Sequence, residues 1–295
     1  MNEKERKIAV IGGDLRQLFI AEILSERGYA VSVFGLDVEK NITSKCISVS
    51  DTLSEAVEGA VLMILPVPLS RDGISINAPL CERKVALSEI FSVANKVKYI
   101  AAGLPDEMSA RLLSENSTLI DYAARDEFAL KNAYATVEGA LAVAFKETSV
   151  TLRGSICTVC GYGRIGKVLV GTLISLGASV KVFARKKLDR VSAELEGASS
   201  YDICEMKKEI YDADIVFNTV PSVIMDKDVL KMLNKNATVI ELASFPGGTD
   251  RSAAEALGVK LINAQSLPGK FSPCSAAETI VESIFSALYE MEVKI

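Results

Sequence analysis

The segment Cys157–Gly166 constrains the fold of this 295-residue chain more than any other feature. It joins an apolar run to three glycines in G-x-G-x-x-G spacing, and an amphipathic stretch follows. This order is typical of a strand, a tight turn and a helix start in a dinucleotide-binding unit. The first glycine permits the turn, the second lets the backbone approach a pyrophosphate, and the third lets the helix pack on the strand. The cofactor-binding residues expected here, at a helix N-terminus that favours phosphate, are Gly161, Gly163, Arg164, Ile165 and Gly166.

The end of the next predicted strand, residues 178–185, bears on the choice of cofactor. NAD sites usually carry Asp or Glu there, which binds the ribose 2′-hydroxyl. This chain instead reads Ala184-Arg185-Lys186-Lys187, without a carboxylate. A 2′-phosphate suits Arg185 in a bidentate contact and Lys186 as a point charge, whereas the alternative is a solvated basic loop. The sequence therefore favours NADP over NAD.

The length and charge of the chain indicate how many domains it has and which partners it lacks. A chain of 295 residues with 49% hydrophobic side chains suggests two domains, each with its own core. The net charge of −5 and the lack of an extended basic stretch argue against nucleic acid as a partner. The charged start of the chain does not resemble a signal peptide, and no apolar run is long enough to cross a bilayer. We expect a cytoplasmic protein without a membrane partner.

Cysteine and histidine usage narrows the chemistry. Cys157 and Cys160 form a C-x-x-C, but both lie in a predicted buried strand, where cysteine acts as a small apolar side chain. The chain has no histidine, which excludes a histidine general base and the usual zinc ligand sets. We therefore expect no metal site, and any proton transfer falls to a carboxylate.

Alternating apolar runs and amphipathic segments predict an α/β chain with two doubly wound parallel sheets. The expected strands are residues 7–11, 30–34, 60–65, 99–102, 118–122, 154–160, 178–185, 215–220, 238–242 and 259–263. The expected domains are an N-terminal α/β (flavodoxin-like) substrate domain at 1–127, an interdomain helix at 128–150, a Rossmann NADP-binding domain at 151–274, and a C-terminal helix at 275–295 that packs on the first domain.

Polar residues beyond the carboxyl ends of the strands are the site candidates, because ligands bind there in open α/β sheets. The turn Gly12–Gln17 lacks the third glycine of the fingerprint, so we expect no second nucleotide. Asp14 suits a helix N-cap as well as a ligand contact. Arg16 lies in the first helical turn, where the helix dipole disfavours a cation, which suggests that it serves an anion.

The second half of the chain offers further candidates in its turns. Residues that follow its strands lie close to the cofactor, and a lysine in the Pro/Gly-rich stretch 267–273 suits a carboxylate or phosphate. The additional cofactor contacts expected are Thr219, Pro221 and Ser244, and the additional anion contact is Lys270.

Several of these segments together resemble the family of dipicolinate synthase A subunits from endospore-forming bacteria, over essentially the whole chain. The segments are Gly12–Gln17, Arg125-Asp126, Asn132 with 136–139, 161–166, 218–222, 246–250 and 267–269. The central part of the chain also looks like D-2-hydroxyacid dehydrogenases and S-adenosylhomocysteine hydrolase in architecture.

The resemblance implies a function that needs two kinds of subunit. The A subunit is expected to work with a flavoprotein B subunit, which carries FMN, in the mother cell of a sporulating bacterium. Together they would convert dihydro- or hydroxytetrahydrodipicolinate, a branch of the lysine pathway, to pyridine-2,6-dicarboxylate. NADP⁺ would accept a hydride and a carboxylate a proton. The expected catalytic candidates are Asp14, Asp126 and Glu138, and the expected substrate-binding residues are Arg16, Gln17, Arg125, Asn132, Thr136 and Lys270.

Other functions remain open at this point. One is a stand-alone NADP-dependent reductase of a hydroxy or imino acid, although the missing histidine disfavours 2-hydroxyacid dehydrogenase chemistry. Another is a non-catalytic nucleotide-binding scaffold for the flavoprotein. Chemistry like that of S-adenosylhomocysteine hydrolase needs tightly held NAD, which Arg185 and Lys186 disfavour. A homo-oligomer is expected, and the sequence leaves open which of the two proteins performs the hydride step.

Overall fold

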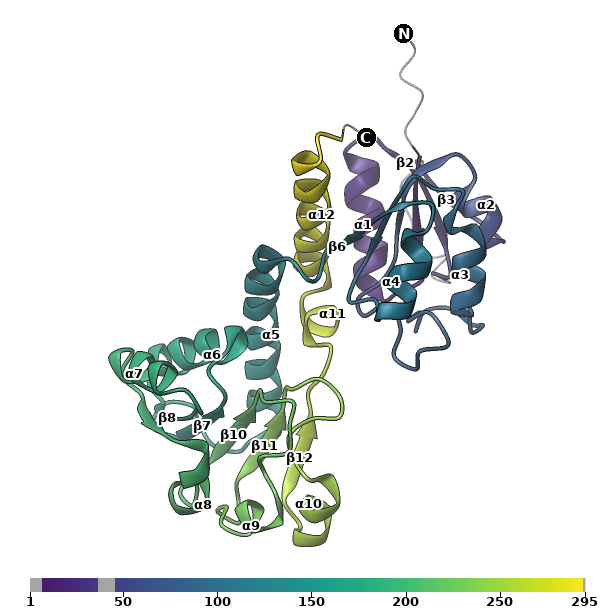
Figure 1. The fold of residues 1–295 in the computed structure, drawn as a ribbon. Helices are drawn as coiled ribbons and strands as arrows, with labels where there is room; N and C mark the ends of the chain where they lie inside the picture. The colour runs from purple at the N-terminus through teal and green to yellow at the C-terminus, as the bar shows by residue number, and fades with distance from the viewer. Residues whose placement is uncertain (1–6, 37–45, 294) are drawn as a thin grey trace. The chain divides into compact units, whose positions relative to one another are not determined.

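The computed structural model describes residues 7–36, 46–293 and 295 (Figure 1). The charged N-terminal segment considered above lies outside these residues. The chain divides into two compact units, residues 1–132 with 272–295 and residues 133–271.

The first unit contains a six-stranded sheet in the order β3-β2-β1-β4-β5-β6, and all neighbouring strands are parallel. Its strands are β1 (Lys7–Ile11), β2 (Ala30–Phe34), β3 (Ile47–Val49), β4 (Ala60–Ile64), β5 (Tyr99–Ala102) and β6 (Thr118–Asp121). Its helices are α1 (Leu15–Glu26), α2 (Leu53–Val57), α3 (Leu87–Ala94), α4 (Glu107–Ser114) and α12 (Pro273–Glu290), and α5 (Asp126–Glu147) runs from this unit into the second.

The period-two alternation of β1 shows why this sheet needs helices on both faces. Ile8 and Val10 lie in one buried cluster, whereas Ala9 and Ile11 lie in another. The first cluster includes buried side chains of α12, and α12 packs directly against α1 (Figure 1). The C-terminal helix is therefore part of the core of the first unit.

The second unit repeats this plan in the order β12-β11-β10-β7-β8-β9, again all parallel. Its strands are β7 (Ile156–Cys160), β8 (Ser179–Phe183), β9 (Ser199–Tyr201), β10 (Ile215–Asn218), β11 (Thr238–Glu241) and β12 (Lys260–Asn263). Its helical segments are α6 (Arg164–Ser175), α7 (Lys187–Leu195), η1 (Ile203–Glu205), α8 (Met206–Glu209), α9 (Lys227–Leu230), α10 (Arg251–Leu257) and α11 (Leu267–Phe271). Its strand order reverses between β7 and β10.

The predicted α/β fold with two doubly wound parallel sheets is confirmed. Two details differ from the sequence-based expectation. The first sheet has the same order as the Rossmann sheet and not the flavodoxin-like order, because the unexpected edge strand β3 adds a third strand beside β2. Lys270 lies on the short helix α11 and not in a loop, since Pro268 and Gly269 are accommodated within that helix.

Candidate functional site

The glycine-rich turn after β7 is tightly packed except where a phosphate would lie. A Cβ atom added to Gly166 would stand 2.3 Å from the carbonyl oxygen of Gly161, and one added to Gly161 would stand 2.5 Å from Thr219 Oγ1. One added to Gly163, the N-cap of α6, would meet no atom of the described residues within 4 Å. The open space therefore lies at the helix N-terminus, where unpaired N–H groups favour an anion. The turn fits a dinucleotide phosphate.

The loop after β10 buttresses this turn. Thr219 donates a hydrogen bond from Oγ1 to the carbonyl oxygen of Cys160 at 2.8 Å. Pro221 and Ser244, which follow β10 and β11, are exposed beyond the carboxyl ends of these strands. Both sequence-predicted positions are thus accessible at the ligand-binding edge of the sheet.

Arg185 and Lys186 are exposed directly after β8. The backbone from which they project is held by Arg190, whose Nη1 donates to the carbonyl oxygens of Ala184 at 2.9 Å and Arg185 at 2.8 Å. Arg190 also pairs with Asp202 at 2.6 Å. Arg190 was not predicted as a site residue, because its role depends on Asp202, a partner twelve residues away that only the fold brings near.

Glu241 is a second residue that the sequence analysis missed. It ends β11, is buried, and accepts hydrogen bonds from Asn218 and Thr249. Its signal in the sequence is a carboxylate that ends a short strand of β-branched residues, and this strand is buried along its whole length.

The first turn of the first unit brings Asp14, Arg16 and Gln17 together. Asp14 is the N-cap of α1 and accepts from the Arg16 N–H at 3.1 Å. The Arg16 guanidinium donates to both Asp14 oxygens, at 2.9 and 2.8 Å, and to the carbonyl oxygen of Val67 at 2.8 Å. The anion that Arg16 meets is therefore Asp14, which explains a cation in the first helical turn. Gln17 is buried beside them and its side chain folds over Gly13.

Burial alone would raise the pKa of Asp14, but the hydrogen bonds and charge of Arg16, together with the charge of Arg71, outweigh it. The net pKa is lower than that of an ordinary aspartate. Asp14 is therefore ionised at neutral pH and holds Arg16 in place.

We expect Asp14→Asn to destabilise the first unit by about 2 kcal/mol at pH 7, because it leaves a buried guanidinium without its carboxylate. A lowered pKa in the folded state stabilises the fold above the pKa of the unfolded chain, and this stabilisation is lost as the pH falls through the folded-state value. The difference from wild type should thus be full at pH 7 and shrink below about pH 4. The free energy of unfolding in urea, measured at pH 7 and at pH 3, gives this difference. Substitution of the exposed Asp51 in Asp51→Asn is the control. An undiminished difference at pH 3 would contradict this account.

The other predicted substrate residues lie further along the chain. Arg125 binds Glu127 and, through Nη1, Glu290 at 3.0 Å. The hydrogen bond to Glu290 is the main reason that the Arg125 pKa is raised. The remaining candidates lie on α5 and α11: Asp126, Asn132, Thr136, Glu138 and Lys270. Of these, Thr136 is buried, Asn132 is half-buried, and the other three are exposed.

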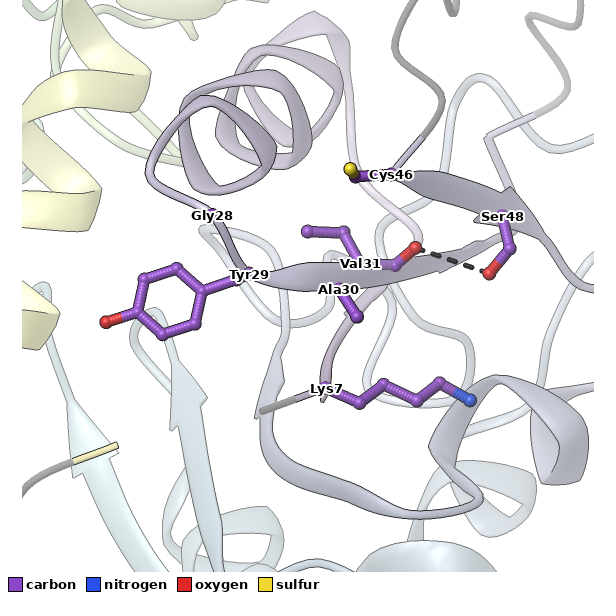
Figure 2. A pocket seen from close by; sticks show the side chains of 7 residues that line it. All are labelled: Lys7, Gly28, Tyr29, Ala30, Val31, Cys46 and Ser48. Carbon is purple, nitrogen blue, oxygen red and sulfur yellow. Dashed lines mark hydrogen bonds between the residues drawn. The ribbon is translucent and has the colours of Figure 1, made fainter. Parts of the chain in front are cut away.

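The first unit has a cavity of about 310 Å³ at the amino ends of its strands (Figure 2). Ligands of open α/β sheets bind beyond the carboxyl ends, so this cavity is not the expected substrate site. It opens at the start of β1 and β2 and beside the start of β3, and the Lys7 ammonium there is held by the carbonyl oxygens of Glu55 and Glu58. Its lining residues are Lys7, Gly28, Tyr29, Ala30, Val31, Cys46 and Ser48.

The prediction that both cysteines of the C-x-x-C are buried is confirmed. Cys157 and Cys160 are buried, and burial raises the pKa of the Cys157 thiol to about 11. Among residues 7–36, 46–293 and 295, no group of three or more acidic or cysteine side chains could hold a metal ion. No helix in this described part of the chain is long and apolar enough to span a bilayer.

The strand order of the second unit and its glycine-rich turn define a Rossmann dinucleotide-binding domain. In agreement, residues 132–280 match the NAD-binding domain of S-adenosyl-L-homocysteine hydrolase. A nicotinamide dinucleotide is therefore the class of cofactor that the comparison supports.

The full chain is similar to one particular group of such proteins. Residues 7–123 match the N-terminal domain of the dipicolinate synthase A subunit. The chain is 31% identical to the A subunit of dipicolinate synthase from Bacillus subtilis, over 98% of this chain and 97% of that protein. The chain belongs to the family of dipicolinate synthase A subunits, as the resemblance of its motifs predicts.

Two crystal structures of this family share the fold. The A subunit of dipicolinate synthase from Bacillus halodurans has a TM-score of 0.84 and 25% identity, over 96% of this chain and 98% of that one. The A chain of dipicolinate synthase from Bacillus subtilis has a TM-score of 0.83 and 28% identity, over 98% of this chain and 97% of that one.

Proposed function

We propose that this chain is the NADP-binding subunit of a dipicolinate synthase, which oxidises dihydro- or hydroxytetrahydrodipicolinate to pyridine-2,6-dicarboxylate during sporulation. The observation that carries the proposal is the open phosphate cradle at Gly163, in a chain related over its whole length to the A subunit of dipicolinate synthase. The proposal includes a flavoprotein partner subunit with FMN, assembly of several copies of this chain, and the cytoplasm of the mother cell as its location.

The choice of NADP rests on the segment after β8. Arg185 and Lys186 are exposed there, and no carboxylate is present between Ala184 and Lys187. A 2′-phosphate has charge and geometry that match a guanidinium, whereas a 2′-hydroxyl needs an acceptor. The Arg190 side chain donates hydrogen bonds to two backbone carbonyl oxygens of this segment and so supports the backbone that carries both cations.

Formation of the aromatic dicarboxylate requires one acceptor for a hydride and one base for a proton. The hydroxytetrahydro ring first loses water to give the dihydro ring. The dihydro ring then loses a hydride and a proton, which leaves the aromatic dicarboxylate. A bound NADP⁺ supplies the hydride acceptor. Cationic side chains bind the two carboxylates of the ring, and the candidates are Arg16, Arg125 and Lys270.

The proton acceptor is a carboxylate, because the chain has no histidine. Asp14 is a poor proton acceptor, since its pKa is lowered and the Arg16 guanidinium donates hydrogen bonds to both of its oxygens. We propose that Asp14 orients Arg16 toward a substrate carboxylate and that Asp126 or Glu138 takes the proton.

Turnover by the reconstituted pair of proteins tests this proposal. Product is followed by the absorbance of pyridine-2,6-dicarboxylate, with NADP⁺ and freshly prepared hydroxytetrahydrodipicolinate. We expect Asp126→Asn or Glu138→Gln to lower kcat about 100-fold, the size typical of a lost general base. Undiminished turnover by a triple variant that also carries Asp14→Asn would contradict a catalytic role and favour a nucleotide-binding scaffold. Turnover of a hydroxy or imino acid by this chain alone would favour a stand-alone reductase.

A further inference from the structure

Glu241 is an ionisable side chain that the reaction itself does not use. It stands at the carboxyl end of β11 and is 1% exposed. Its carboxylate accepts hydrogen bonds from Asn218 Nδ2 at 2.8 and 3.0 Å and from Thr249 Oγ1 at 2.7 Å. It also accepts from the backbone N–H groups of Ala243 and Gly248, each at 3.1 Å.

The partners of Glu241 all donate, and none of the ion pairs among the described residues includes it. Burying a carboxylate away from water and without a cation is costly unless hydrogen bonds to the charged group compensate. An amide at this position would turn an NH₂ group toward some of these donors. The arrangement therefore requires a group that only accepts.

The donors lie at the end of β10 and in the loop after β11, at the ligand-binding edge of the sheet. Asn218 is the last residue of β10. Its side chain donates from Nδ2 to the carbonyl oxygen of Val220 and accepts at Oδ1 from the Val220 N–H, so it also holds the loop after β10. Ala243, Gly248 and Thr249 belong to the loop after β11. A Cβ atom on Gly248 would stand 2.2 Å from the carbonyl oxygen of Val220, so the two loops touch where they meet above the carboxylate.

These two loops lie on one side of the point at which the strand order reverses, between β7 and β10. A dinucleotide lies across that point, and the basic residues for its adenosine ribose follow β8 on the other side. The loops after β10 and β11 therefore face the nicotinamide half. Thr219 connects the first of them to the phosphate turn through its hydrogen bond to Cys160.

We propose that Glu241 is a positioning residue that fixes the loops after β10 and β11 for the nicotinamide half of the bound dinucleotide. The inference rests on the nucleotide site of the proposed function. It predicts that loss of the carboxylate impairs contacts with the nicotinamide half of the dinucleotide and leaves contacts with the adenosine half unchanged.

The affinity of the Glu241→Gln variant for two ligands tests this prediction. The Kd of NADP⁺ should rise about tenfold, the size of one lost hydrogen bond to a charged group. The Kd of adenosine 2′,5′-bisphosphate, which lacks the nicotinamide half, should stay within about twofold. Isothermal titration of the purified full chain measures both. Glu255→Gln, an exposed glutamate on α10 in the same unit, is the matched control and should change neither value.

Two substitutions of Thr249 test the same inference if Glu241→Gln does not fold. Thr249→Val removes one donor with little change of shape, and should weaken NADP⁺ selectively, whereas Thr249→Ser restores the hydroxyl and should recover most of the affinity. Equal weakening of both ligands, or no weakening, would overturn the inference. Wild-type protein that binds neither ligand would instead overturn the proposed nucleotide site, so the two failures are distinguishable.

Discussion

Gly163→Asp is expected to weaken NADP⁺ binding severely while leaving the second unit at least as stable as in the wild type. Gly163 is the N-cap of α6 with φ of −81°, a conformation open to any residue, and a Cβ atom there meets no described atom within 4 Å. Aspartate is a better N-cap than glycine by a few tenths of a kcal/mol. Its carboxylate, however, would stand where a pyrophosphate binds, and we expect the Kd to rise about 100-fold or more, because two anions would share one helix N-terminus.

Gly163→Asn is the matched control, since it has the same shape and capping ability without the charge. It should retain more affinity for NADP⁺ than Gly163→Asp does. Thermal unfolding and nucleotide titration on the same samples provide the two readouts. Retained affinity in Gly163→Asp would show that the phosphates do not bind at this turn.

The second large effect is expected at the end of β8. The double substitution Arg185→Ala with Lys186→Ala should raise the Kd of NADP⁺ about 100-fold, because it removes two charged contacts to a 2′-phosphate. The Kd of NAD⁺ should stay within about twofold, since the 2′-hydroxyl needs neither cation. Titration of wild type and variant with both nucleotides measures the change in preference.

Lys187→Ala is the control for a general loss of positive charge, because Lys187 is the next residue and begins α7. It should weaken neither nucleotide by more than about twofold. A wild type that binds NAD⁺ as tightly as NADP⁺, or a double variant that weakens both equally, would contradict the assignment of NADP.

The regular parts of this fold could be predicted from the sequence because parallel strands buried on both faces appear as short apolar runs. The run Ile156–Cys160 is such a case, and the glycines after it indicate where the turn and the helix start lie. The three-residue edge strands β3 and β9 were not predicted, since they are too short to show a period and are partly exposed.

The candidate site was predictable only where local chemistry decides it. Asp14 as an N-cap follows from its place before an apolar helix, and the structure confirms it. The bidentate pair of Asp14 with Arg16 depends on side-chain conformations that no spacing reveals. Glu241 was missed for a related reason: its donors come from residues 23 positions before and 8 positions after it, and only the parallel pairing of β10 with β11 brings them together.

The most direct test of the proposed function is the ratio of NADPH formed to pyridine-2,6-dicarboxylate formed by this chain together with the flavoprotein subunit proposed as its partner, with oxygen excluded. Both products are followed by absorbance from the same reaction. We expect one NADPH for each dicarboxylate, because we propose that the hydride leaves the ring for a dinucleotide bound at the Gly163 turn. Dicarboxylate formed without NADPH would show that the electrons pass to another acceptor, and would contradict a role for this chain in the oxidation.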